Sequence, residues 1–154
     1  MTTMPDDVLE LLRGPCLCYV ATTMPSGAPQ LTQVWADTDG EHVVLNIVEG
    51  SQKERNLRRD PRIAVAVSDP ADPSHYVQLR GSVVQMTTEG GSDHIEALSE
   101  KYTGGPYAWW GGRDRVRVKV LIEVRRVAGS GGQRRGRAAS THRPHEAGMQ
   151  EPQI

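Results

Sequence analysis

The spacing of apolar residues changes after the first fifteen positions of the chain. Residues 5–14 (PDDVLELLRG) place Leu9 and Leu12 on one helical face, after a proline and two aspartates that favour a helix start and before a glycine that favours its end. From Cys16 onward, apolar residues alternate with polar ones or form short β-branched runs, which is typical of strands. The pattern predicts a short N-terminal helix followed by a chain dominated by β-structure.

Six strands are expected, separated by turns rich in glycine, proline and aspartate. Asp39 and Gly40 are a strong hairpin signal between the second and third strands, so the first three are expected to form a meander. The fourth is apolar almost throughout, which indicates burial on both faces, and Gly81 in the fifth indicates a bulge or a bend. The expected strands span residues 16–24, 30–38, 41–48, 62–69, 75–87 and 115–127.

The last expected strand alternates strictly, so its apolar side chains should face the interior and its arginine and lysine side chains should mostly face outward. The inward set is Val116, Val118, Val120, Ile122 and Val124. Two further helices are expected, one over the basic segment after Gly50 and one over residues 92–102, with Ile95 and Leu98 on its apolar side together with Tyr102. Together these elements predict a mainly β (α+β) fold, a closed or half-closed antiparallel barrel.

Composition places the chain among ordinary globular proteins. It has 154 residues, 37% of them hydrophobic, a formal net charge of −1, and no run of roughly 20 apolar residues that could span a bilayer. The acidic N-terminus does not resemble a secretory signal, so we expect a cytoplasmic protein with no membrane partner. Residues 1–128 should form one domain, and residues 129–154, which have almost no apolar content, a disordered tail.

Two cysteines, Cys16 and Cys18, would lie on the same side of an extended strand. Neighbours that close in an extended chain rarely form a disulfide, so both are expected to be buried thiols in a reducing compartment. No further histidine, cysteine or carboxylate stands at a spacing typical of metal ligands, and no metal site is expected.

A basic segment, SQKERNLRRDPR, runs from Ser51 to Arg62 in an otherwise near-neutral chain. Ser51 can cap a helix there, with Glu54 completing a capping box. Lys53 and Arg55 would then lie in the first turn, where the helix dipole disfavours cations but an anion is readily bound. The remaining basic residues, near the helix end, are expected to form a solvated face. The five basic side chains are Lys53, Arg55, Arg58, Arg59 and Arg62.

Three tryptophans could contact a flat ligand. Trp35 lies within the second expected strand, where either a core position or a place in a binding site would suit an indole. Trp109 and Trp110 adjoin in the glycine-rich stretch TGGPYAWWGG, where packing on a partner subunit or a planar ligand is expected. The chain contains no phosphate-loop, dinucleotide-binding or serine-hydrolase motif in a fitting context.

Several motifs together resemble those of one family. S-x-K-x-R-N-L-x-R-D-P-R follows the third strand, and V-x-L-x-G, K-Y-x-G-x-P-Y and the alternating final strand come after it. Over residues 8–127 the chain resembles the pyridoxamine 5′-phosphate oxidase-like split β-barrel superfamily (the FMN-binding split-barrel type), and within it the actinobacterial branch that uses the deazaflavin coenzyme F420. The resemblance implies a six-stranded antiparallel split β-barrel that forms a homodimer with cofactor sites at the subunit interface.

The resemblance also implies which residues hold the cofactor. Ser51, Gln52, Lys53 and Arg55 would hold its phosphate or the start of its acidic tail, with Asn56 nearby. The tricyclic ring would be lined by Gln30, Leu31, Thr32, Gln33, Val34 and Trp35, with Asn46 and Ile47 beside them.

The implied activity is transfer of a hydride from reduced F420 to a small conjugated, electron-poor acceptor such as an enone, quinone, nitroaromatic or tetrapyrrole. Because the cofactor supplies the hydride, no catalytic side chain is expected. Flavin-type members carry a basic pair on the second strand and an arginine where this chain has Gln52, so the resemblance favours F420 over FMN and weighs against a pyridoxal-phosphate product.

Three alternatives remain at this level. One is an FMN-binding oxidoreductase or oxidase on the same fold, and another is a protein that binds a flavin, deazaflavin or haem without turnover. The third, a nucleic-acid binder acting through the basic QRRGR stretch, is disfavoured because the net charge is −1 and no recognition module is visible. We therefore expect no nucleic-acid partner.

Overall fold

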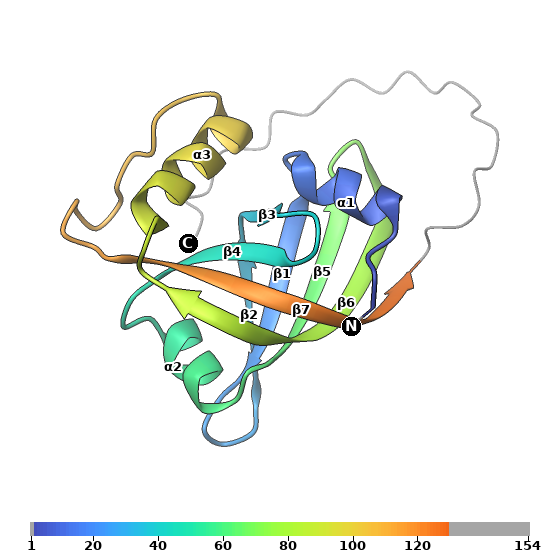
Figure 1. The fold of residues 1–154 in the computed structure, drawn as a ribbon, viewed down its shortest axis with the longest axis horizontal. Helices are drawn as coiled ribbons and strands as arrows, with labels where there is room; N and C mark the ends of the chain where they lie inside the picture. The colour runs from blue at the N-terminus through green and yellow to red at the C-terminus, as the bar shows by residue number, and fades with distance from the viewer. Residues whose placement is uncertain (1, 130–154) are drawn as a thin grey trace.

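The computed structural model describes residues 2–129, in which three helices flank one curved β-sheet (Figure 1). The mainly β split-barrel prediction is confirmed, although the described sheet has seven strands rather than six. The helices are α1 (Asp6–Arg13), α2 (Gln52–Arg59) and α3 (Gly91–Thr103). The strands are β1 (Leu17–Thr23), β2 (Pro29–Val34), β3 (Ala36–Thr38), β4 (Val43–Val48), β5 (Arg62–Asp69), β6 (Asp72–Thr87) and β7 (Arg117–Gly129).

The additional strand arises because the expected second strand breaks at Trp35. β2 ends at Val34 and pairs with β1, whereas β3 begins at Ala36 and pairs with β4. All three residues are buried, so the alternation of inner and outer positions stops here. The chain therefore changes its pairing partner at a buried bend.

The strand order is β2-β1-β5-β6-β7-β4-β3, and every adjacent pair is antiparallel. β2 and β3 lie at opposite edges of this order, yet only Trp35 separates them along the chain. The sheet must therefore curl until its edges approach, as a split barrel does. The pairings expected for the three-strand meander are confirmed, because residues 29–34 pair with β1 and residues 36–38 pair with β4. The middle strand is not continuous, however, and its two parts lie at opposite edges of the strand order.

The sheet encloses the main core on one face. In β5, Ile63, Val65 and Val67 are buried but Ala66 is exposed, so the prediction of burial on both faces is wrong. The outward positions carry alanine, whose methyl group gains little from burial, and this made the strand seem apolar throughout.

Gly81 allows a close approach of two strands, which confirms the predicted irregularity. The register between β6 and β7 shifts from Arg80 to Gly81. A Cβ atom on Gly81 would lie 2.1 Å from the carbonyl oxygen of Glu123. Only glycine, which has no side chain, fits at this separation.

β7 confirms four of the five predicted inward side chains. Val118, Val120, Ile122 and Val124 are buried in the main core. Val116 is 43% exposed, which corrects the fifth, because the strand begins only at Arg117 and its alternation does not extend to Val116.

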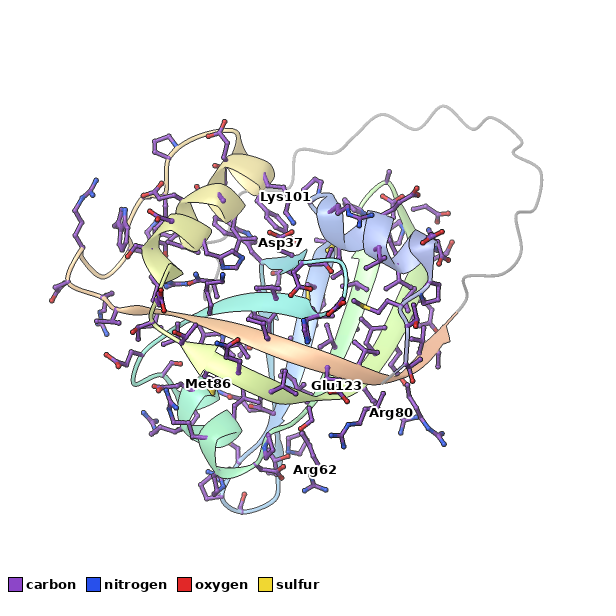
Figure 2. All side chains as sticks on the ribbon, in the orientation of Figure 1. Asp37, Arg62, Arg80, Met86, Lys101 and Glu123 are labelled. Carbon is purple, nitrogen blue, oxygen red and sulfur yellow. The ribbon has the colours of Figure 1, made fainter. Side chains whose placement is uncertain are left out.

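α3 covers the outer side of β4 and β7 and creates a second apolar cluster there. The buried members of this cluster are Trp35, Ile95, Leu98 and Tyr107, with Tyr102 and Trp109 packed beside them. Lys101 of α3 lies beside Asp37 of β3, as Figure 2 shows, with its Nζ 3.7 Å from Asp37 Oδ1. The same Nζ donates to the carbonyl oxygens of Ala36 and Leu12, which ties α3 to both β3 and α1.

Cys16 and Cys18 are free and buried, as predicted, and burial raises the pKa of both thiols. Within residues 2–129, no helix is long and apolar enough to cross a membrane. The same residues contain no group of three or more His, Cys, Asp or Glu side chains that could hold a metal ion. The predicted C-terminal tail lies outside the described residues, apart from Gly129 at the end of β7.

Candidate anion and cofactor site

The first turn of α2 is built as the sequence predicts, with one difference. Ser51 Oγ accepts a hydrogen bond from the backbone N–H of Glu54 at 3.3 Å. The Glu54 carboxylate accepts from the N–H of Gly50, one residue before the position expected for a capping box. These bonds fix the start of the helix and, with it, the position of Lys53.

Lys53 is a buried cation without an acidic partner. Its side chain is 7% exposed, and no carboxylate among residues 2–129 forms an ion pair with it. Burial lowers its pKa, and the charge of Arg117 lowers it further. The nearby N–H groups at the start of α2 add partial positive charge, so the whole region favours an anion.

Arg117 is a second buried cation in this region, and sequence reasoning missed it. It is 2% exposed, its Nε donates to Asn46 Oδ1 at 2.7 Å, and its guanidinium lies 5.5 Å from the ring centre of Tyr107. Burial lowers the pKa of Arg117 too. None of the carboxylates in the described residues pairs with it.

Arg117 faces away from the main core, as expected for its strand, but α3 covers that face. Asn46 Nδ2 reaches the first residue of α3, donating to the Gly91 carbonyl oxygen at 2.8 Å, and lies 3.1 Å from His94 Nδ1. A pattern of alternation separates the two faces of a strand but carries no signal that a later helix will cover one of them. We call Lys53, Arg117 and the first turn of α2 the anion site.

The other basic residues of the segment are engaged by protein groups. Arg58 pairs with Glu54 at 2.7 Å, and Arg62 pairs with Asp60 at 2.7 Å. Arg59 donates to the Thr23 carbonyl oxygen. This agrees with the prediction that the later arginines do not form the anion site.

A chain of amides joins α2 to the second strand and brings four predicted site residues together. Asn56, which is fully buried, donates from Nδ2 to Thr22 Oγ1 at 3.0 Å and to Gln30 Oε1 at 3.2 Å. Gln52 Nε2 donates to Asn56 Oδ1 at 2.8 Å, and Arg55 donates to Gln52 Oε1 at 2.7 Å. Arg55 is exposed, so it differs from Lys53 in both burial and pairing.

The remaining predicted ring-lining residues do not share one face. Leu31 and Gln33 are exposed on the outer side of β2, whereas Val34 and Ile47 belong to the main core. Thr32 carries a buried hydroxyl oxygen that has no hydrogen-bond partner among residues 2–129. Trp35 is stacked on Tyr102 under α3, with ring centres 5.2 Å apart. The proposed contacts of these residues with a ring therefore stay predictions.

A family model for pyridoxamine 5′-phosphate oxidase matches residues 4–126. Among solved structures, an F420 reductase is 27% identical, with a TM-score of 0.72 over 81% of this chain and 98% of that chain. The conserved hypothetical protein Rv2991 from Mycobacterium tuberculosis is 29% identical, with a TM-score of 0.62 over 80% of this chain and 82% of its own. A pyridoxamine 5′-phosphate oxidase-like protein from Listeria innocua, at 16% identity and a TM-score of 0.58 over 80% of this chain and 94% of its own, shares the fold.

One curated relative is the DNA ligase of Stenotrophomonas maltophilia (strain K279a). It is 29% identical over 86 residues, which are 56% of this chain but only 10% of the ligase. The similarity therefore concerns a small part of the ligase and says nothing of ligation by this chain.

Proposed function

Because the chain belongs to the pyridoxamine 5′-phosphate oxidase family, we propose that it is an oxidoreductase that holds the phosphate of a flavin-type cofactor at its anion site. The observation that carries the proposal is the burial of Lys53 and Arg117 close together without an acidic partner among the described residues. Buried like charges are unfavourable, and a bound phosphate would offset both. The side-chain amides of Gln30 of β2 and Asn56 of α2 are hydrogen-bonded to each other and would offer further polar contacts.

Coenzyme F420 is the cofactor we propose, with FMN as the alternative. β2 carries no cation, and Gln52 is bonded to Asn56 and Arg55 within the amide chain. The similarity to an F420 reductase over 98% of that protein's length supports the same choice. When bound, the deazaflavin would supply a hydride to a conjugated, electron-poor acceptor.

The side chains of this protein would bind and orient rather than transfer protons. Lys53 and Arg117 would fix the phosphate end, and the buried setting would exclude water from it. We propose no general acid or base, because the ring and the acceptor need only be held in place for hydride transfer, and the proton that completes the reduction would come from water. A cytoplasmic location is part of the proposal, supported by the two free thiols.

We further propose that the chain acts as a homodimer. Leu31 is 68% exposed and Tyr19 is 42% exposed on the outer side of β2 and β1, and the exposed Ala66 lies opposite Tyr19 on β5. This apolar part of the outer face would be covered by the same face of a second copy.

Titration of the purified full-length chain tests the proposal. We expect the protein to quench the fluorescence of F420 on binding, and inorganic phosphate to weaken that binding by competition. If FMN binds more tightly than F420 and the complex shows a flavin absorption spectrum, FMN would be the cofactor instead of F420. Absence of binding to both would overturn the proposal, and binding without reduction of any acceptor in a quinone and enone panel would leave only a carrier.

A further inference from the structure

The segment between α3 and β7, residues 104–116, has a constrained backbone. Trp109 has a φ of +51°, a conformation that is uncommon for residues other than glycine. Gly111 and Gly112 follow with φ values of +87° and +101°. Such conformations persist only where surrounding contacts maintain them, and they cluster at functional sites.

Glu96 on α3 provides those contacts. Its carboxylate accepts hydrogen bonds from the backbone N–H of Tyr107 at 2.9 Å and from Trp109 Nε1 at 2.8 Å. These two bonds lower the pKa of Glu96, so the carboxylate is ionised at neutral pH. One side chain on a helix therefore fixes the segment at two points.

This arrangement presents the indole of Trp110 in a defined orientation. Trp110 is 40% exposed, although its ring neighbours Trp35 and Tyr107 are buried. It packs edge-to-face with both, at centroid distances of 6.5 Å and 5.3 Å. An exposed ring held by two buried rings offers an aromatic surface at little cost in side-chain entropy.

The exposed indole is connected to the anion site through a single side chain. Tyr107 contacts Trp110 on one side and lies 5.5 Å from the Arg117 guanidinium on the other. A ligand on Trp110 would therefore lie near a cofactor whose phosphate is held by Arg117.

The neighbours of Trp110 favour a small molecule over a protein partner. Two glycines and the exposed charged residues Arg113, Asp114 and Arg115 follow it in the chain. A protein interface requires a broader apolar surface, whereas a flat conjugated molecule can be bound by one indole.

We propose that Trp110 binds the planar, conjugated hydride acceptor and that Glu96 is a positioning residue for Trp110. The acceptor role rests on the proposed oxidoreductase function. The binding of a planar molecule does not, and can be measured on the protein without cofactor.

The experiment measures binding of menadione, a planar quinone, to the full-length chain by equilibrium dialysis. Trp110→Leu is expected to weaken binding at least tenfold and Glu96→Gln at least fivefold. Glu100→Gln, on the exposed side of the same helix, is the matched control and should change binding less than twofold. Trp109→Phe removes the Nε1 donor but keeps a ring, and should resemble Glu96→Gln.

Kinetics with reduced F420 then separate a positioning role from a merely structural one. Glu96→Gln should raise KM for menadione several-fold with little change in kcat, and F420 affinity should stay within twofold of wild type. Unchanged menadione binding in both Trp110→Leu and Glu96→Gln would overturn the inference. So would a shift of Trp110→Leu from dimer to monomer with menadione binding intact, because the indole would then be a subunit contact. Absence of binding of both F420 and FMN to the wild-type chain would instead contradict the proposed function.

Discussion

At the scale of single residues, Lys53 and Arg117 differ from the other cations of the described structure in being buried without an acidic partner. Their burial is a cost to the ligand-free fold, whereas Arg58 and Arg62 are each paired with a carboxylate. Such unfavourable burial of charge is typical of binding sites, where the residues that bind a ligand lower the stability of the ligand-free fold.

Lys53→Met should therefore act in opposite directions on binding and on stability. Loss of a charged hydrogen bond should weaken F420 binding by about 1.5–3 kcal/mol, which is roughly a 10- to 150-fold rise in Kd. The ligand-free melting temperature should rise, because the variant no longer buries this charge beside Arg117. Arg62→Met removes the same charge at an exposed position and should leave F420 binding nearly unchanged. Equal loss of binding in both variants would mean that the segment acts only as a general basic surface.

The lowered pKa of Lys53 predicts a pH dependence of anion binding. The unfolded chain holds the lysine proton up to the usual pKa of 10.5, but the folded chain releases it at a lower pH. Phosphate affinity should therefore fall as the pH rises through the pKa of Lys53 in the folded chain, below 10.5. Over the same pH range the ligand-free fold should become more stable, because the neutral lysine no longer repels Arg117. Lys53→Arg keeps its charge in this range, so its phosphate affinity, measured by calorimetry, should stay level. A parallel fall in both proteins would assign the titration to another group.

At the scale of elements, the break at Trp35 depends on side chains of α3. The Tyr102 hydroxyl accepts from the N–H of Ala36 at 3.1 Å and donates to the Cys16 carbonyl oxygen at 2.9 Å. Lys101 donates to the Ala36 carbonyl oxygen. The helix thus satisfies backbone groups at the point where the chain leaves β2 and enters β3.

Tyr102→Phe should keep the ring stacked on Trp35 but leave the Ala36 N–H and the Cys16 carbonyl without their partner. A buried group that loses its hydrogen bond costs about 1–3 kcal/mol, so urea unfolding should show a loss of that size. An unchanged midpoint for Tyr102→Phe would show that the break does not depend on this hydroxyl.

The contact of β6 with β7 predicts a strict requirement at Gly81. Gly81→Ala would place a methyl group 2.1 Å from the Glu123 carbonyl oxygen, and since the obstacle is backbone, two strands must separate. Forcing extra volume into a packed site costs about 1–3 kcal/mol, which denaturant unfolding can resolve. Gly105→Ala, where an added Cβ meets no atom within 4 Å, should change stability little. Similar effects of the two changes would mean that β6 shifts to accept the methyl group.

At the scale of the whole molecule, local sequence patterns predicted where helices and strands lie better than they predicted which strands pair with one another. Alternation placed Val118, Val120 and Ile122 inward because strand periodicity is a local property. The same reasoning missed the barrel closure at Trp35, since no local signal shows that the chain will change its pairing strand there.

The candidate site divides in the same way. Lys53 was predictable from its place in the first turn of α2, because caps and charges are read from neighbouring residues. Arg117 lies 64 positions further along the chain and is buried only because α3 folds over its strand, so its role depends on tertiary packing. Glu96 has no sequence motif at all, and its importance follows from two hydrogen bonds to residues 11 and 13 positions away.

The outer face of β2, β1 and β5 leads to a prediction about assembly. It exposes Leu31 of β2, Tyr19 of β1 and Ala66 of β5, and it is the side of the sheet opposite the main core. If two copies cover this face, sedimentation should report about twice the chain mass of 16.9 kDa. Leu31→Lys should shift the protein toward monomer, because it would place a charge in the centre of an apolar contact without a partner. Val84→Lys, a matched change at a residue of β6 that is 50% exposed, should leave the dimer intact. If the wild-type chain is a monomer and still binds F420, one chain holds the complete anion site. The exposed leucine would then serve another contact.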